Sequence, residues 1–177
     1  FSPTDYRSYL FSMWSNSQLI MSDIYISGNF YDAPLKFNTN LESTISECIF
    51  NNTLNIDRKP GIPIGAQNSK LVLDGCTFES NGQLRFRNTV VNIDGCTFNS
   101  NSGDQGGAIN ADSSSYLNIT DSEFTLNGAT EKGGAIYATN ININDTEFIG
   151  NHAPIGGAIY INDLSDSAVN ITGSVFD

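Results

Sequence analysis

Residues 143–159 read INDTEFIGNHAPIGGAI, and this stretch carries two short motifs that recur along the chain. The first motif is FxxN, here Phe148–Asn151, and the second is GGAI, here Gly156–Ile159. FxxN also occurs at Phe78–Asn81, Phe98–Asn101 and Phe124–Asn127. GGAI also occurs at Gly106–Ile109 and Gly133–Ile136. A chain that returns to the same residues at similar intervals is built from repeated structural units.

Alignment on the phenylalanine of FxxN extends the repeat towards the N-terminus. The aligned positions are Ile26, Phe50, Phe78, Phe98, Phe124, Phe148 and Phe176. They are separated by 24, 28, 20, 26, 24 and 28 residues. Units of about 20–30 residues with short alternating segments predict a solenoid, in which each unit packs on its neighbours.

The alternation of hydrophobic residues changes phase inside each unit. Val91 and Ile93 share one parity, and after the pair Asp94-Gly95 the inward residues take the other parity. Such a shift predicts two strands joined by a tight corner, and GGAI supplies a third strand. We therefore expect an all-β, right-handed three-sided parallel β-helix of about seven coils. It would form one domain over residues 1–177, with 1–18 as a first strand or N-terminal cap and 19–177 as repeats.

The repeated residues have structural roles in such a fold. Neighbouring coils lie about 4.8 Å apart, so each repeated position forms a ladder along the solenoid. The predicted core ladder is Phe50, Phe78, Phe98, Phe124, Phe148 and Phe176. The predicted corner ladder, in which amides bond to one another and to free backbone groups, is Asn29, Asn81, Asn101, Asn127 and Asn151. The double glycine predicts a corner with positive φ or with no room for a Cβ atom.

Composition points to an extracellular or cell-surface protein without nucleic-acid partners. The chain has 19 acidic and 8 basic residues and a formal net charge of −11, so it cannot replace the counterions of a phosphate backbone. No apolar run reaches the length of a membrane span. N-glycosylation acceptors stand at Asn51, Asn118, Asn144 and Asn170, which favours secretion and predicts N-glycans.

GGAI and FxxN together resemble the repeats of the chlamydial polymorphic outer-membrane proteins. Similar repeats occur in predicted surface proteins of eukaryotic microbes. The resemblance covers residues 71–177 well and residues 9–70 loosely, where Ile26 and Asn29 stand for Phe and Asn and Thr53 replaces the Asn. It implies a secreted, surface-displayed β-helix involved in adhesion.

Two side-chain ladders are candidate ligand sites. Cys48, Cys76 and Cys96 each stand two residues before the aligned Phe, so they should stack inward as free thiols, with a bonded pair or a metal site as alternatives. Corner carboxylates stand at Asp23, Glu47, Asp74, Asp94, Asp121 and Asp145. They could hold Ca²⁺, or they could simply be the residues that suit a corner, and the latter is our expectation. We expect no cofactor.

Catalysis is not expected from the sequence. Polysaccharide-cleaving β-helices need a carboxylate cluster on an open face, and lyases also need a Lys or Arg. The basic residues are few and scattered, and the lone His152 has no assignable partner. The expected function is a non-catalytic structural or adhesive solenoid. The alternative is a carbohydrate-binding or polysaccharide-cleaving β-helix.

The GGAI strand offers a candidate contact face. Its predicted outward positions are Ala108, Ala135 and Ala158, followed by Asn110, Tyr137 and Tyr160. Small residues beside the stacked tyrosines Tyr137 and Tyr160 would make a flat, partly aromatic strip suited to another protein or a sugar. The expected partners are other copies of the protein or components of the cell surface or matrix.

The ends of the repeat predict continuation or self-association. The last unit stops at Phe176-Asp177, before its corner, and Tyr9–Trp14 already reads as a strand. An uncapped solenoid end exposes unpaired backbone groups. We therefore expect either a stretch of a longer β-helix or a protomer that associates end to end into a filament.

Overall fold

The fold is that of a computed structural model, which describes residues 9–30, 32–39, 41–55, 57, 59–162 and 168–177. The expected N-terminal cap falls partly on residues 1–8, outside the described residues. The strand predicted at Tyr9–Trp14 corresponds to β1 (Phe11–Ser15). The described residues form strands and their connections, with no helix among them.

Three parallel sheets of seven strands each make up the fold. The first sheet contains β1, β4 (Leu35–Thr39), β7 (Ile64–Gln67), β10 (Leu84–Arg87), β14 (Ile109–Ala111), β18 (Ile136–Ala138) and β21 (Ile159–Ile161). The second contains β2 (Ile20–Ser22), β5 (Glu42–Ser46), β8 (Lys70–Asp74), β11 (Val90–Asp94), β15 (Tyr116–Thr120), β19 (Asn140–Asn144) and β22 (Val169–Thr172). The third contains β3 (Tyr25–Asn29), β6 (Ile49–Leu54), β9 (Thr77–Glu79), β12 (Thr97–Asn99), β16 (Glu123–Thr125), β20 (Glu147–Ile149) and β23 (Val175–Phe176).

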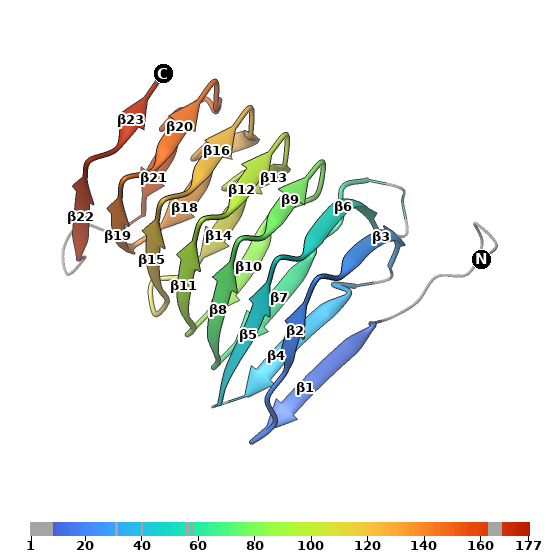
Figure 1. The fold of residues 1–177 in the computed structure, drawn as a ribbon. Helices are drawn as coiled ribbons and strands as arrows, with labels where there is room; N and C mark the ends of the chain where they lie inside the picture. Colours follow the sequence, from blue (N-terminus) through green and yellow to red (C-terminus); the bar gives the residue numbers. More distant parts are fainter. Residues whose placement is uncertain (1–8, 31, 40, 56, 58, 163–167) are drawn as a thin grey trace.

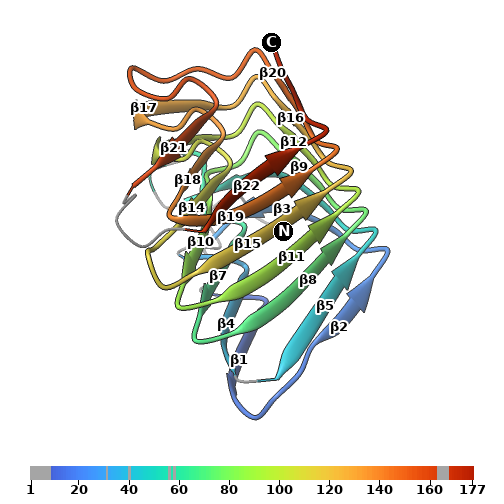
Figure 2. The same cartoon turned by 90° about the vertical axis from the view of Figure 1, so that its left-hand side faces the viewer.

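Consecutive strands of the chain lie in different sheets, so the chain winds through one strand of each sheet per turn. We call such a turn a coil. Figure 1 shows the coils stacked in sequence order from β1 to β23. Figure 2 shows the strands of the second sheet lying side by side and parallel, one from each coil. The predicted three-sided parallel β-solenoid is confirmed, with seven coils.

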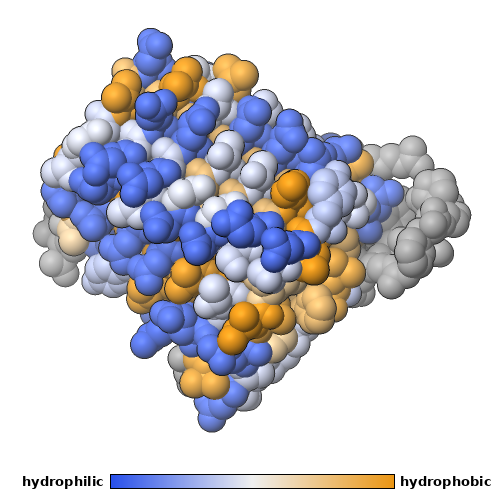
Figure 3. Space-filling model, in the orientation of Figure 1, coloured by the Kyte–Doolittle hydropathy of each residue, from blue (hydrophilic) through white to orange (hydrophobic). Residues whose placement is uncertain are grey.

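Hydrophobic side chains of all three sheets fill the bore of the solenoid, whereas hydrophilic residues cover much of the face drawn in Figure 3. In β15, Leu117 and Ile119 are buried while Asn118 between them points outward, as the period of two in a strand requires. The six phenylalanines of the core ladder form one continuous stack, with ring centroids 4.5–4.9 Å apart. Phe176, at the end of the stack, is half exposed.

The asparagines of FxxN complete the corner between the third and first sheets. The Asn127 Oδ1 accepts the backbone N–H of Asn101 at 3.0 Å, and its Nδ2 donates to the Phe98 carbonyl at 2.9 Å. Asn81, Asn101 and Asn151 donate in the same way to the phenylalanine of the preceding coil. Each amide therefore satisfies backbone groups in the coil before its own, where water cannot reach them.

The prediction that Asn29 belongs to this ladder is wrong. The register between β3 and β6 shifts after Ile26, so Asn29 pairs with Leu54 and Gly28 pairs with Thr53. Thr53 takes the ladder position, and its N–H donates to Asn81 Oδ1 at 2.9 Å. A bulge adds a residue to one strand of a pair, and spacing along the sequence does not reveal it.

The double glycine of GGAI combines both predicted reasons for glycine. The first glycine has a positive φ, 73° at Gly106 and 64° at Gly133. The second lacks room, because a Cβ on Gly134 would overlap the carbonyl oxygen of Gly157 and lie 2.5 Å from the His152 backbone nitrogen. The corner therefore brings backbones of neighbouring coils into direct contact.

The prediction that Ala108 and Ala135 point outward is wrong. Both are fully buried and belong to the core, and Ala158 is partly buried against it. These alanines precede the strands β14, β18 and β21 and lie in the corner itself. The alternation that holds inside a strand does not extend to a corner residue.

Candidate binding face on the first sheet

The first sheet places one outward residue from each coil in a single row along the solenoid. We call these residues the outward row: Ser12, Lys36, Gly65, Arg85, Asn110, Tyr137 and Tyr160. Each is the direct lateral partner of the next, so the row is fixed by backbone register. Neighbouring members lie about 4.8 Å apart along the axis. The character of the row changes from basic near β4 and β10 to aromatic at β18 and β21.

Two tyrosines form the aromatic end of the outward row. The rings of Tyr137 and Tyr160 stack with centroids 5.5 Å apart and planes 13° from parallel, and both are half-buried. Lys132 Nζ lies 4.6 Å from the Tyr160 ring centroid, a cation–π distance. The Tyr137 hydroxyl donates to Asn162 Oδ1. Burial raises the pKa of the Tyr137 phenol, which keeps that hydroxyl protonated.

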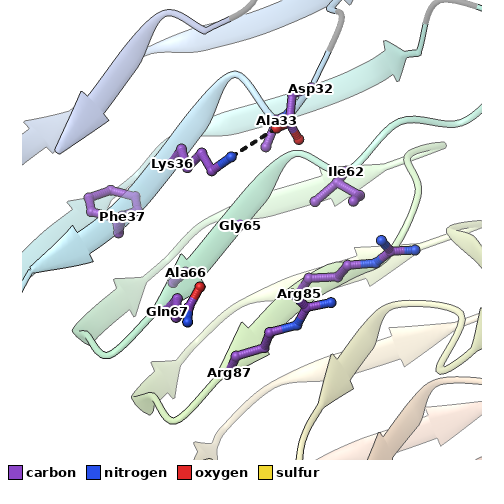
Figure 4. A pocket seen from close by; sticks show the side chains of 10 residues that line it. All are labelled: Asp32, Ala33, Lys36, Phe37, Ile62, Gly65, Ala66, Gln67, Arg85 and Arg87. Carbon is purple, nitrogen blue, oxygen red and sulfur yellow. Dashed lines mark hydrogen bonds and ion pairs between the residues drawn. The ribbon is translucent and has the colours of Figure 1, made fainter. Parts of the chain in front are cut away.

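Near β4, β7 and β10 the face is hollowed into a cleft of about 210 Å³. Gly65 stands in the outward row between Lys36 and Arg85 (Figure 4). Because glycine has no side chain, the space above it stays open and forms the cleft. The Lys36 ammonium bonds to Asp32 Oδ2 at 3.0 Å. Burial opposes ionisation of Asp32, but hydrogen bonds from the Ala33 N–H and from Lys36 lower its pKa.

Two further hollows adjoin this cleft and share Arg85 with it. One, of about 370 Å³, includes Asp104, Asn110 and Glu131 in its lining, and the other, of about 540 Å³, includes Asn55 and Lys59. Their walls come from the corner after β6 and from the two-stranded parallel sheet of β13 (Ser102–Gln105) and β17 (Gly128–Lys132). The corners that connect the third sheet to the first therefore shape this side of the molecule.

Three of the eight basic residues lie close together, which the sequence reasoning missed. Lys36, Arg85 and Arg87 all lie on the outward face of the first sheet. The signal was available in β10, where LRFR alternates buried Leu84 and Phe86 with two exposed arginines. The proximity of these arginines to Lys36 was not visible in the sequence, because it depends on how β4 and β10 are aligned with the β7 strand between them.

The three cysteines lie in the bore, away from this face. All are buried free thiols. The Cys96 Sγ accepts the Cys76 N–H at 3.4 Å, and the Ser122 hydroxyl accepts the Cys96 N–H at 3.1 Å, so thiols and hydroxyls fill one ladder. The side-chain hydrogen bond between Cys76 and Cys96, together with burial, raises the pKa of Cys96.

The corner carboxylates occupy two neighbouring registers of the second sheet's corner. Asp74 pairs with Asp94, whereas Asp121 and Asp145 stand in left-handed conformation with φ of 47° and 48°. Aspartate tolerates that conformation, which explains its use in a tight corner. Among the described residues, no group of three or more His, Cys, Asp or Glu side chains could hold a metal ion. His152 packs its ring on Gly128 instead.

The four glycosylation acceptors lie at outward or corner positions. Asn118 and Asn170 alternate with inward residues of β15 and β22. Asn170 Nδ2 donates to Asn142 Oδ1 at 2.8 Å, and Asn118 Nδ2 donates to Asn92 Oδ1 at 2.9 Å. Asn51 bonds to Glu79, and Asn144 bonds to Asp145. None of the four side chains contributes to the bore.

The class of protein defined by these features is a three-sided parallel β-solenoid with a sculpted, partly aromatic face. Residues 121–139 and 145–162 match the family model of the Chlamydia polymorphic membrane protein repeat. These two segments contain the last two FxxN and GGAI pairs, so the predicted resemblance is confirmed and the chain carries repeats of that kind. No curated protein and no solved structure matches the chain. Among the described residues, no helix has the length and apolar character needed to cross a bilayer.

Proposed function

We propose that this chain is a non-catalytic adhesive β-solenoid displayed at the cell surface, and that it binds its partner through Tyr137 and Tyr160. The observation that carries the proposal is the stacked pair on the outward face of the first sheet, with Lys132 over the Tyr160 ring. The match to a membrane-protein repeat supports surface display. Expected partners are cell-surface or matrix components, or other copies of the protein.

The stacked pair has the properties of a binding hot spot. Tyrosine offers a large rigid surface with a polar tip, and such residues dominate the energetics of protein interfaces. The pair is half-buried and its hydroxyls contact Asn162 and Lys132, so little conformational freedom remains to be lost on binding. The seven-stranded sheet beneath keeps the face rigid.

Replacing both tyrosines with serine (Y137S/Y160S) should weaken adhesion at least about tenfold, since a pair of hot-spot aromatics contributes 2 kcal/mol or more. Binding of the labelled protein to intact cultured cells and to an immobilised extracellular-matrix layer would measure this. A matched control is Y25S/Y116S, which removes two exposed tyrosines from the third and second sheets.

The control should bind as the unmodified chain does, and thermal unfolding should show that both double variants remain folded. Equal adhesion by the two double variants would place the contact elsewhere and contradict the proposal. Loss in both would indicate that adhesion has no preference for the first sheet, which also contradicts it.

Secretion predicts a glycoprotein. Asn118 and Asn170 lie on strands with their side chains outward, where a glycan would not disturb the bore. We expect peptide mapping of material from the native source to find N-glycan on at least these two asparagines, with Asn51 and Asn144 as further acceptors. Four unmodified acceptors in native material would remove the support that glycosylation gives to a secreted protein.

A further inference from the structure

Arg85 lies where three adjoining hollows of the first-sheet face meet. The hollows reach from β4 through β7 and β10 to β14 and the β13–β17 sheet. The coils of β4 and β14 are three coil spacings apart, which is about 14 Å along the axis. A groove of that length accommodates an extended chain molecule rather than a single small one.

Two arginines on β10 provide free cationic groups in this groove. Arg85 and Arg87 are two residues apart, so both point outward, and both are exposed. Their side chains run the same way over the strand (Figure 4). Neither forms an ion pair or a side-chain hydrogen bond with another described residue. Lys36, by contrast, is already held by Asp32. Each unpaired guanidinium group offers a planar fork that matches a carboxylate.

The surroundings of the two arginines argue against a densely charged ligand. Carboxylates line the same hollows: Asp32, Asp104, Asp112 and Glu131. Together with a net charge of −11 they repel nucleic acids, heavily sulfated chains and acidic peptides. Uncharged amides also line the hollows: Gln67, Gln83, Gln105 and Asn110. Carboxylates accept hydrogen bonds from hydroxyl groups, and amides both donate and accept.

We propose that this groove binds an oligosaccharide bearing isolated carboxylates, of the uronate or sialate class, with carboxylate groups held by Arg85 or Arg87 and the hydroxyls held by the flanking amides and acids. The ligand class follows from the combination of paired free arginines with many hydroxyl-binding groups. The site is separate from Tyr137 and Tyr160, so it stands whether or not those tyrosines mediate adhesion.

Gly65 gives the groove its depth and offers a way to block it. A Cβ at Gly65 would meet only the Ala33 Cβ, at 3.7 Å, and its φ is not in the left-handed region. A valine at this position should therefore fold normally on the strand while filling the floor between Lys36 and Arg85. It blocks the groove by shape and leaves every charge in place.

The test is calorimetric or fluorescence titration of the full chain with defined probes: a trisaccharide with one uronate residue, its neutral methyl ester, a sialylated trisaccharide and a sulfated heparin tetrasaccharide. We expect at least one of the two carboxylated probes to bind. Comparison of the affinities of the uronate probe and the sialylated probe distinguishes the two sugar classes. The methyl ester should bind at least tenfold more weakly than the free acid. The sulfated probe should bind more weakly than the preferred carboxylated one.

The variants R85Q, R87Q and G65V should each weaken binding of the preferred probe at least about tenfold. The control K70Q removes an exposed positive charge from β8 on the second sheet and should change binding less than twofold. Y137S/Y160S should retain saccharide binding.

Three outcomes overturn the proposal. They are no binding of either carboxylated probe at millimolar concentration, equal binding of the methyl ester, and equal binding by R85Q and K70Q. Tighter binding of the sulfated probe would overturn the ligand class. Because R85Q and R87Q alter exposed side chains, both variants should give the same circular dichroism spectrum and the same thermal unfolding as the unmodified chain. A loss of binding by these folded variants then reports on the groove.

Discussion

Truncation of Phe124 to alanine should lower the free energy of unfolding by about 3–5 kcal/mol, the range for large core deletions. The Phe124 ring is fully buried and stacks on both sides, 4.5 Å from Phe98 and 4.9 Å from Phe148. Its loss would leave a gap in the middle of the bore, which neighbouring coils cannot close because each is fixed by its backbone ladder. Equilibrium urea denaturation followed by circular dichroism would measure the change.

Phe176→Ala provides the matched control for the same substitution. That ring stacks on one side only, 4.8 Å from Phe148, and half of it is exposed. The loss should therefore be well below that of Phe124→Ala. A cost at Phe124 equal to that at Phe176 would mean that neither the second stacking contact nor the deeper burial of Phe124 stabilises the fold, which contradicts the prediction. In a solenoid the central gap could also separate the transition into two steps, since stability is a sum of coils and the interfaces between them.

A methyl group at Gly134 should be almost as damaging as the lost ring. We expect Gly134→Ala to cost about 3 kcal/mol, at the upper end of overpacking, because the new Cβ would meet backbone rather than a yielding side chain. The neighbouring coil would have to move away, which would also lengthen the backbone hydrogen bond from the Ala135 N–H to the Ala158 carbonyl. Thermal and urea unfolding would show the loss.

Gly157 is the equivalent glycine in the next coil and serves as the control. A Cβ there would approach nothing closer than Asn151 O, at 3.7 Å. Gly157→Ala should stay within about 1 kcal/mol of the unmodified chain. If the two alanine variants unfolded alike, the double glycine would be required by conformation at its first position only, and the close approach of coils would not matter for stability.

The sequence was sufficient for the architecture because the repeated positions obey simple periods. The interval of 20–28 residues identifies the solenoid, and the phase change at Asp94-Gly95 places the corner that the structure has. The sequence failed at Asn29 and at Ala108. There a bulge and a corner replace regular alternation, and neither leaves a mark on the spacing.

The candidate site was only partly visible for a different reason. Stacking of Tyr137 on Tyr160 followed directly from the shared GGAI register. The groove did not, because it depends on a missing side chain at Gly65 and on walls made by irregular corners. Which basic residues meet across several coils is settled by tertiary register, and a single strand carries no information on that.

The corner between the third and first sheets absorbs nearly all the irregularity around the groove. It is short after β9, where residues 80–83 lead directly into β10, and long after β12, where residues 100–108 include β13 before β14 begins. The core ladders on either side keep their spacing in both cases. The bore and the walls of the groove are thus built largely by different residues. A lineage of such proteins can lengthen, exchange or duplicate corner segments, and so reshape the groove, without changing the solenoid itself.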